Sequence, residues 1–329
     1  MLREIEHKTL LFLQSIPNKA QTLPILVCVS GGADSMVLLS ILKTLRDDER
    51  VQKIMPIELA AIHFNHEQRG LESDADEALV REITALWKIS LVAEKFSETA
   101  APFVKGNFQE KAREWRYQRA TLALSKVFEK KAEAAWLATA HHARDNAETV
   151  LLNIIRGTGV EGLQGIAHTD AQRKLLRPLL NFDSQEIRNY ANEAQVPFRE
   201  DSSNATTDYS RNLLRHRILP VIAELNPNFE QSLIRLTQNA QSVLQEIHIP
   251  EGPLPLGTCV STTQILKLAK RTNSQLAAAI TAQVLQNILH HARLASRQRP
   301  PVRVREVPLT NGWIALIDDS GLSFVKHQA

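Results

Sequence analysis

The sequence predicts an α/β protein with a doubly wound parallel sheet, followed by a second, mostly helical C-terminal domain. Ile25 to Val29 is a continuous apolar run, rich in β-branched residues, which is typical of a fully buried parallel strand. Runs of this kind alternate with stretches of helical spacing, as in parallel sheets covered by helices. Polar segments at 30–35, 63–72 and 141–149 each follow a predicted strand, so we expect them to meet at the carboxyl edge of the sheet.

The N-terminal part of the chain carries the alternating pattern. A helix over residues 2–17 precedes the first strand, and Asp34 and Ser35 stand in the first turn of a helix at 34–46. Further strands are expected at 57–65, 91–96 and 135–140, and further helices at 73–87, 106–128 and 145–156.

The C-terminal part is mainly of helical pattern. Helices are expected at 184–195, 211–219, 227–247 and 262–295, and a β-hairpin at 302–317 around Asn311-Gly312. Residues 248–257 contain three prolines and two glycines, which predicts an interdomain linker. We expect one domain at 1–217 and a second, mostly helical domain at 218–329 that ends in the hairpin.

Composition narrows the class of protein. The chain has 329 residues, 43% of them hydrophobic, which is enough for two or three domains with sizeable cores. A net charge of +3 is compatible with a nucleic-acid partner without requiring one. Cys28 and Cys259 form no metal or disulfide motif, which fits a reducing compartment. Because the sequence has no signal-peptide pattern and no apolar run of membrane-spanning length, we expect a soluble, cytoplasmic protein.

Residues 30–35 form a candidate phosphate site. The order strand, glycine loop, helix aims backbone N–H groups and the positive end of a helix dipole at one point. Gly31 and Gly32 let the backbone turn sharply and approach a ligand closely. A Gly-Gly turn alone is more often an ordinary chain reversal, and no Gly-Lys-Ser/Thr follows, so this is not a Walker A loop.

The segment from His141 to Thr149 begins where the fourth predicted strand ends. Its histidines and acids suggest a metal site, but the spacing is not that of a zinc helix. The alternative is a helix start in which Asp145 is the cap and Glu148 satisfies the first turn. The spacing alone leaves this alternative open.

Two levels of resemblance join these segments. Ser30 to Ser35 resembles the SGGxDS signature of the PP-loop ATP pyrophosphatases, whose fold is an adenine nucleotide alpha hydrolase-like sheet. The ordered set of motifs over residues 24 to 240 resembles the tRNA(Ile)-lysidine synthetases. The matching segments are His63 to Ser73, Asn107 to Tyr117, His141 to Leu152, Arg156 to Gly165, Arg177 to Leu180, Asp201 to Asn204 and Tyr209 to Pro220. The sequence departs from the motifs at Glu67-Gln68, Arg144, Asn146 and Ser202.

The resemblance implies a ligase that uses ATP and Mg²⁺, with the ATP-binding catalytic site in the domain at 1–217 and tRNA binding by the domain at 218–329. Its RNA substrate is an isoleucine tRNA with a CAU anticodon. ATP adenylates the oxygen on carbon 2 of the wobble cytidine (position 34) and pyrophosphate leaves; the ε-amine of free L-lysine then attacks that carbon and AMP leaves. The product, lysidine, changes the codon from AUG to AUA and the amino acid from methionine to isoleucine. The sequence leaves open whether the protein forms a homodimer.

The resemblance also assigns roles to residues. It implies nucleotide binding by the loop and His63, and Mg²⁺ binding by Asp34; the nucleotide set is Ser30, Gly31, Gly32, Ala33, Asp34, Ser35 and His63. The catalytic set is Asp34, Arg113, Asp145 and Glu148. Lysine must attack as a neutral amine, so a carboxylate has to accept a proton; Asp145 is the first choice and Glu148 the second.

The basic residues each have an ordinary alternative. Arg113 could belong to a solvated salt-bridge face of its helix, and the resemblance favours contact with lysine, the base or the adenylate. Arg211, Arg215 and Arg217 lie on one predicted helix, where contact with tRNA phosphates is the favoured reading over a charged surface helix. For the cluster of Arg297, Arg299, Arg303 and Arg305, a tRNA contact and a plain basic surface are equal alternatives.

Other function classes share part of the pattern. A PP-loop tRNA thiolase would need catalytic or cluster-binding cysteines, which this sequence lacks. An ammonia-using ATP pyrophosphatase would have the loop without the basic helix at 211–217. A non-enzymatic RNA-binding module would have no use for Asp34 and Asp145.

Overall fold

The computed structural model describes most of the 329-residue chain. The described residues are 2–17, 22–65, 67, 70–96, 108–200, 209–246, 262–273, 276–277, 280–296, 304–309, 313–318 and 320–326. The chain divides into two compact units: Met1–Leu152 with Gly165–Arg235, and Asn153–Gln164 with Leu236–Ala329. The predicted boundary after residue 217 stays a prediction, and the predicted linker at 248–257 lies outside the described residues.

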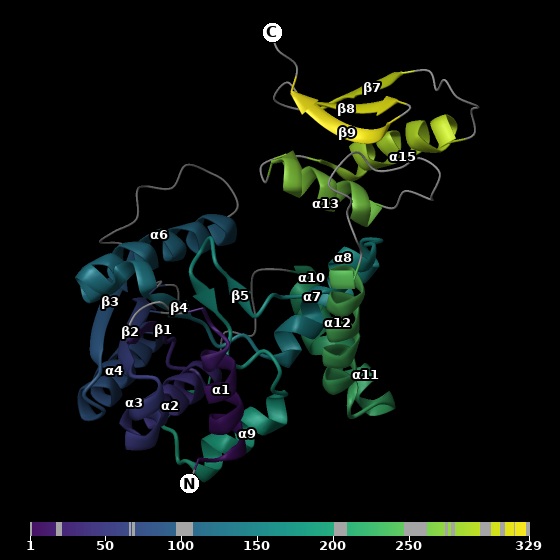
Figure 1. Ribbon diagram of the computed structural model, residues 1–329. Helices are drawn as coiled ribbons and strands as arrows, with labels where there is room; N and C mark the ends of the chain where they lie inside the picture. Colours follow the sequence, from purple (N-terminus) through teal and green to yellow (C-terminus); the bar gives the residue numbers. More distant parts are fainter. Residues whose placement is uncertain are drawn as a thin grey trace. The chain divides into compact units, whose positions relative to one another are not determined.

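The first unit is built on a six-stranded sheet in the order β3-β2-β1-β4-β6-β5 (Figure 1). β1 pairs in parallel with both β2 and β4, β2 with β3, and β4 with β6, whereas β5 is antiparallel to β6. The strands are β1 (Leu23–Cys28), β2 (Ile57–Asn65), β3 (Ser90–Lys95), β4 (Trp136–Ala138), β5 (Thr169–Asp170) and β6 (Leu175–Leu176). The predicted doubly wound parallel sheet is therefore confirmed.

Helices cover both faces of this sheet because alternate residues of the buried strands point to opposite faces. Ile25 and Val27 pack with residues of α1 (Glu4–Gln14), α2 (Ala33–Asp47), α4 (Leu71–Leu86) and α9 (Ser184–Glu193). Leu26 packs on the other side with α6 (Phe108–Phe128). Figure 1 shows α6 and α2 on opposite sides of the strands.

Helix α2 lies in the centre of one layer. Its buried residues include Met36, Val37, Leu38 and Leu39, all with 0% exposure, so it is apolar on more than one side. It contacts the sheet and also α1, α9 and α3 (Glu49–Ile54). Because a helix this enclosed has little freedom to move, its first turn is held in a fixed position at the end of β1.

The remaining helices of the described chain connect the layers or follow them. They are η1 (Glu129–Ala134), α7 (Ala143–Ile155), α8 (Val160–Leu163), α10 (Tyr209–Leu213), the π-helical turn η2 (Leu214–Ile218), α11 (Leu219–Leu225) and α12 (Phe229–Glu246). The basic helix predicted at 211–219 is therefore found as α10 and η2, and its second half has the wider π-helical turn.

The second unit has its own core. Helices α13 (Thr262–Thr272) and α15 (Ala282–Ser296) pack against a three-stranded antiparallel sheet in the order β7-β8-β9. Its strands are β7 (Arg305–Pro308), β8 (Trp313–Asp318) and β9 (Gly321–Lys326). Among the described residues, Arg305 is the one member of the predicted C-terminal arginine cluster, and it lies in β7.

Three expectations differ from the structure. The single helix predicted at 262–295 is wrong, because α13 ends at Thr272 and Asn273 is not helical. The predicted hairpin is extended by β9, whose pattern was not singled out. β5 and β6 were missed because each is two residues long, too short for a periodic signal. Over the part of the chain that is described, no helix has the length and apolar character needed to cross a membrane.

The enclosed position of α2 gives a testable prediction. Replacing Leu38, which has 0% exposure, with alanine should lower the free energy of unfolding by about 2–5 kcal/mol, because it leaves a cavity in a packed core. The matched control is Leu86→Ala at the exposed end of α4, where we expect a change within about 0.5 kcal/mol. Denaturant unfolding of both variants measures the difference. Equal losses would contradict the enclosed position of Leu38.

Candidate functional site

The loop from Ser30 to Ser35 is braced by its own serines. The Ser35 hydroxyl accepts a hydrogen bond from the Ser30 N–H at 3.0 Å and donates one to the Gly32 carbonyl at 3.0 Å. The two serine hydroxyls lie 3.1 Å apart, and the Gly32 N–H points at the Ser30 hydroxyl from 3.4 Å. Gly31 has a φ of +93°, a conformation that favours glycine. Ser35 is therefore used to shape the loop.

The first turn of α2 supplies the groups that an anion needs. Gly32 is the N-cap residue, and Ala33 and Asp34 open the 15-residue helix. The first N–H groups of a helix have no partner within the helix, and the helix dipole adds partial positive charge at this end. The structure therefore brings together the backbone groups that the sequence predicted for phosphate binding.

His63 lies behind this loop. Its ring is buried at the end of β2, and its Nδ1 is 2.8 Å from the Val29 carbonyl oxygen. Because a carbonyl only accepts, Nδ1 carries the proton and donates. Burial lowers the pKa of His63, so the ring is neutral at neutral pH. Its Nε2 is buried without a hydrogen-bond partner among the described residues. His63 is thus in contact with the strand that leads into the loop.

A second polar cluster lies at the start of α7. Asp145 is the third residue of α7 and accepts the N–H of His142, the residue before the helix, through Oδ2 at 3.0 Å; it is not the cap residue that the alternative expected. Glu148 does not satisfy the first turn either, because its Oε1 accepts from Arg215 Nε at 2.7 Å. Arg215 also donates through Nη2 to Asp145 Oδ1 at 3.3 Å. The side chain of Glu148 is 4% exposed and that of Asp145 24%.

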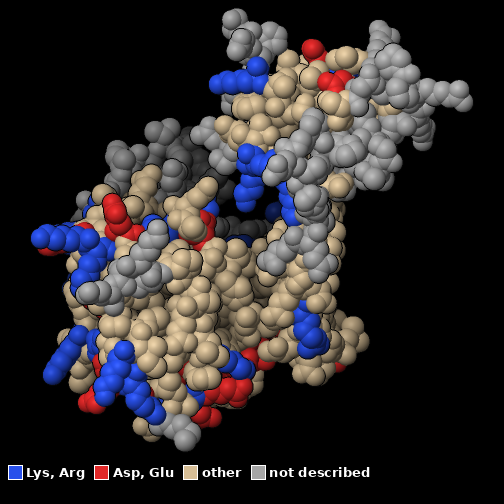
Figure 2. Space-filling model, viewed as in Figure 1, with Lys and Arg blue, Asp and Glu red and all other residues tan. Residues whose placement is uncertain are grey.

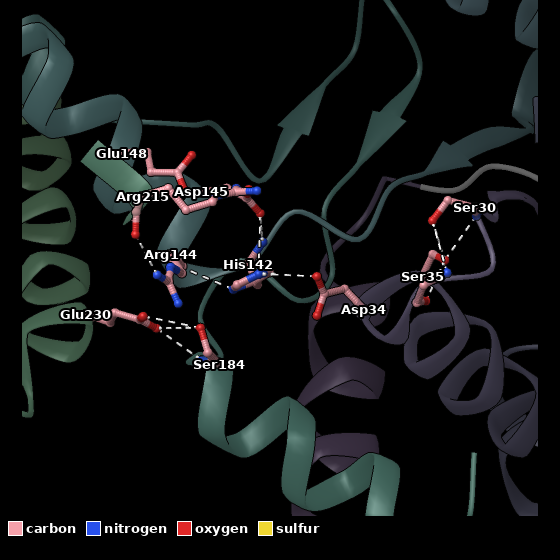
Figure 3. A network of polar contacts seen from close by, with 11 residues as sticks. Ser30, Asp34, Ser35, His142, Arg144, Asp145, Glu148, Ser184, Arg215 and Glu230 are labelled. Atoms are coloured by element: carbon pink, nitrogen blue, oxygen red, sulfur yellow. Dashed lines mark hydrogen bonds and ion pairs between the residues drawn. The ribbon is translucent and has the colours of Figure 1, made fainter. Parts of the chain in front are cut away.

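His142 connects the two clusters (Figure 3). Its Nε2 is 3.5 Å from Asp34 Oδ2 and 3.7 Å from Asp145 Oδ2. Its Nδ1 accepts the Arg144 N–H at 3.3 Å, so the neutral ring carries its proton on Nε2, toward both carboxylates. Burial alone would lower the pKa of His142, but the hydrogen bond to Asp34 and the nearby charges of Asp145, Asp34 and Glu230 raise it above its usual value.

Asp34 is the most accessible acid of the network. Its side chain is 52% exposed. Partial burial alone would raise the pKa of Asp34, but His142, Arg215 and Arg188 together hold it below its usual value. Asp34 is therefore ionised at neutral pH and presents an open carboxylate from the first turn of α2, which suits a hard cation. No group of three or more metal-ligating side chains occurs in the described ranges, so any Mg²⁺ here would take most of its ligands from phosphate and water.

The arginines predicted to bind tRNA or substrate differ in their exposure and contacts. Arg217 is exposed and has no hydrogen bond or ion pair with another described residue. Arg211 is exposed and has further contacts. Arg215 instead points to the carboxylates of α7. Arg113 belongs to α6, but its side chain lies outside the described residues.

Sequence reasoning missed two residues of the network. His142 was recognised only as part of a motif, and its place beside the strand end was the available signal. Arg144 was noted as a departure from the motif; its Nη2 donates to the Arg215 carbonyl at 3.1 Å and so ties α7 to η2. That contact joins residues 71 positions apart, and no local pattern predicts it.

A mostly parallel sheet in which a glycine loop leads from β1 into a helix start is an arrangement typical of nucleotide-binding proteins. A model of the PP-loop domain family matches residues 2–222. A tRNA(Ile)-lysidine synthase from Porphyromonas gingivalis is 36% identical over 67% of this chain and 45% of its own length. One from Chlorobaculum tepidum is 31% identical over 91% of this chain and 90% of its own length. A U34-tRNA thiolase from Methanococcus maripaludis, solved with its 4Fe-4S cluster, shares the fold with a TM-score of 0.54 and 19% identity, over 76% of this chain and 81% of its own.

The chain belongs to the tRNA(Ile)-lysidine synthase family. It spans less than half the length of the Porphyromonas gingivalis relatives that it matches.

The pairing of Arg215 gives a prediction on stability. Arg215→Gln leaves the buried carboxylate of Glu148 without its cation, which should cost about 1–3 kcal/mol of the free energy of unfolding. Arg217→Gln, two residues along the same segment, is the matched control and should change it by no more than about 0.5 kcal/mol. Urea unfolding of both variants at pH 7 makes the comparison. Equal effects would mean that Glu148 does not depend on Arg215.

Proposed function

We propose that this protein is an ATP-dependent ligase that joins free L-lysine to the wobble cytidine of an isoleucine tRNA. The observation that carries the proposal is the network of Asp34, His142 and Asp145. It joins the phosphate-binding loop to a carboxylate pair at the neighbouring strand end. We therefore propose that the nucleotide and the nucleophilic amine bind within this single set of contacts, as an adenylation followed by amine attack requires.

The loop side of the network serves the first step. The N–H groups at the start of α2 bind the phosphates of ATP and stabilise the charge that develops as pyrophosphate leaves. Mg²⁺, held by Asp34 and the phosphates, would neutralise the same charge when bound. Ser30 and Ser35 keep the loop in shape, and His63 supports it from β2.

The α7 side serves the second step. The lysine amine must lose a proton, and Asp145 is the better acceptor because its side chain is more accessible than that of Glu148. Glu148 is held beneath Arg215, so we assign it to orienting that guanidinium. Arg215 then acts inside the site, next to the reacting groups. We assign Arg113 to contact with lysine, the base or the adenylate.

Arg211 and Arg217 remain the tRNA contacts in this proposal. Both are exposed on the segment that carries Arg215 toward the carboxylates. Among the described residues on the face seen in Figure 2, basic side chains stand in separate groups, several of them beside acidic ones. We propose that phosphate contacts near the site dock the anticodon. The proposed substrates are cytoplasmic, so we propose the same location for the protein; a homodimer stays a prediction.

A PP-loop thiolase is the main alternative, because a thiolase shares the fold. Cys28 argues against it. It lies in β1, and burial raises the pKa of its thiol to about 12, so it is neither a thiolate nucleophile nor a ready cluster ligand. The one other cysteine, Cys259, cannot supply a cluster by itself.

The proposal is tested with radiolabelled lysine, ATP, Mg²⁺ and two tRNA transcripts that differ only in the wobble base. We expect label in the cytidine transcript, with release of AMP and pyrophosphate, and none in the uridine transcript. Asp34→Asn should abolish pyrophosphate release. Pyrophosphate release with no lysine transfer to either transcript would support the adenylating site and contradict the assignment of lysine as the second substrate.

The two carboxylates can be separated by step. Asp145→Asn should lower lysine transfer about 10²–10⁴-fold, the usual loss for a general base, while pyrophosphate release continues. Glu148→Gln removes a charge from the same helix, one turn further along α7. Because Glu148 acts through Arg215, the loss of lysine transfer in this variant should be smaller than that in Asp145→Asn by about tenfold or more. Single-turnover assays of both products give the answer. A larger loss in Glu148→Gln would reverse the two assignments.

A further inference from the structure

Asp76 and Arg199 form an ion pair behind the phosphate loop, which we call the bracket. Asp76 lies on α4, and Arg199 follows α9, so the pair joins elements that are far apart in the sequence. Arg199 Nε is 3.0 Å from Asp76 Oδ1. The side chain of Asp76 is 13% exposed and that of Arg199 45%. Neither residue belongs to the reaction proposed above.

Both members of the bracket contact the loop. The Arg199 N–H donates to the Gly31 carbonyl at 3.0 Å, and Arg199 forms a parallel β-bridge with Gly32. Asp76 lies against Gly31 from the other side: a Cβ built on Gly31 would be 3.3 Å from Asp76 Cβ and 3.4 Å from its carbonyl oxygen. The ion pair therefore holds two contacts of Gly31 in place: the packing of Asp76 against it, which we call the wall, and the hydrogen bond from the Arg199 N–H to its carbonyl, which we call the anchor.

The anchored carbonyl decides which way the next amide points. A peptide unit is planar and trans, so its C=O and N–H point in opposite directions. With the Gly31 carbonyl held by Arg199, the Gly32 N–H must point to the other side, where it meets the Ser30 hydroxyl at 3.4 Å. Because this peptide lies between two glycines, it would turn over readily without an anchor. A turned peptide would aim a carbonyl oxygen at the phosphates.

We propose that Asp76 and Arg199 are positioning residues that set the Gly31–Gly32 peptide for binding the phosphates of ATP. The inference deepens the proposed function, on whose nucleotide site it rests. The bracket acts through the backbone of the loop and touches no substrate. The bracket can change the affinity for ATP by no more than the free energy of the ion pair itself. For a partly exposed ion pair, that free energy corresponds to a change of about three- to fivefold in affinity.

A direct role for Arg199 is the competing account, because its side chain is partly exposed near the loop. The two accounts predict opposite results for Asp76→Ala. If Arg199 bound phosphate itself, loss of Asp76 would free its guanidinium and strengthen ATP binding. If the pair positions the peptide, the same change weakens ATP binding. Alanine keeps the Cβ that packs on Gly31, so the wall is retained while the ion pair is removed.

The experiment is equilibrium dialysis of Mg·ATP against the full chain, without lysine or tRNA. We expect Asp76→Ala and Arg199→Ala each to raise the Kd about three- to fivefold, and the double variant to be no worse than either single one. Arg199→Lys, which keeps a cation, should stay near the parent value. The matched control is Arg173→Ala, which breaks the Arg173–Asp170 pair away from the loop and should leave the Kd unchanged.

Two results would overturn the inference. One is an unchanged Kd in both single variants, including the case where only their thermal stability falls. The other is tighter ATP binding in Asp76→Ala, which would assign Arg199 to the phosphates directly. Because the dialysis contains no lysine and no tRNA, a failed lysine-transfer assay leaves its outcome unaffected, and the two proposals fail separately.

Discussion

Helix α2 has to be enclosed along its length and open at its first turn. The enclosure comes from a run of side chains with no exposed surface, packed between the sheet and three helices. The opening exists because β1 ends at Cys28 and the chain turns through two glycines before the helix begins. Unpaired amides at a helix start are useful to a ligand only if they do not move. The packing of α2 therefore sets the geometry on which the neighbouring contacts are built.

Two basic side chains lie among the acids around that first turn. Asp34, Asp145 and Glu148 bring three carboxylates to two adjacent strand ends, and repulsion among them would separate the segments. Arg215 offsets two of the carboxylates, and the Nε2–H of His142 points between Asp34 and Asp145. One imidazole therefore contacts both the carboxylate at the start of α2 and a carboxylate of α7.

The sequence was informative where function depends on consecutive residues. The strand, the glycine turn and the acids of residues 141–149 lie within short windows, and the rule that strand ends meet brought them to one edge. It was uninformative where contacts join distant segments. Nothing local distinguishes Arg215, which turns inward to Glu148, from Arg217, which stays exposed, because both lie in the same π-helical turn. The pairing of Asp76 with Arg199 spans 123 residues and has no periodic signal.

Two departures from the family motif are explained by the contacts that the replaced residues make. Arg144 replaces an acid and holds the carbonyl of Arg215, so the changed residue supports the cation that the carboxylates need. Asn146 replaces a glutamine, and its Oδ1 accepts the Ile166 N–H at 2.8 Å. A Cβ on Gly165, whose φ is +63°, would overlap that same oxygen, so the shorter amide and the glycine fit each other. Both replaced residues join α7 to segments that follow it. Asp145, which lies between them, and Glu148, which follows them, match the motif. A motif can therefore change at its supporting residues, provided that each new side chain still fixes the helix that carries the acids.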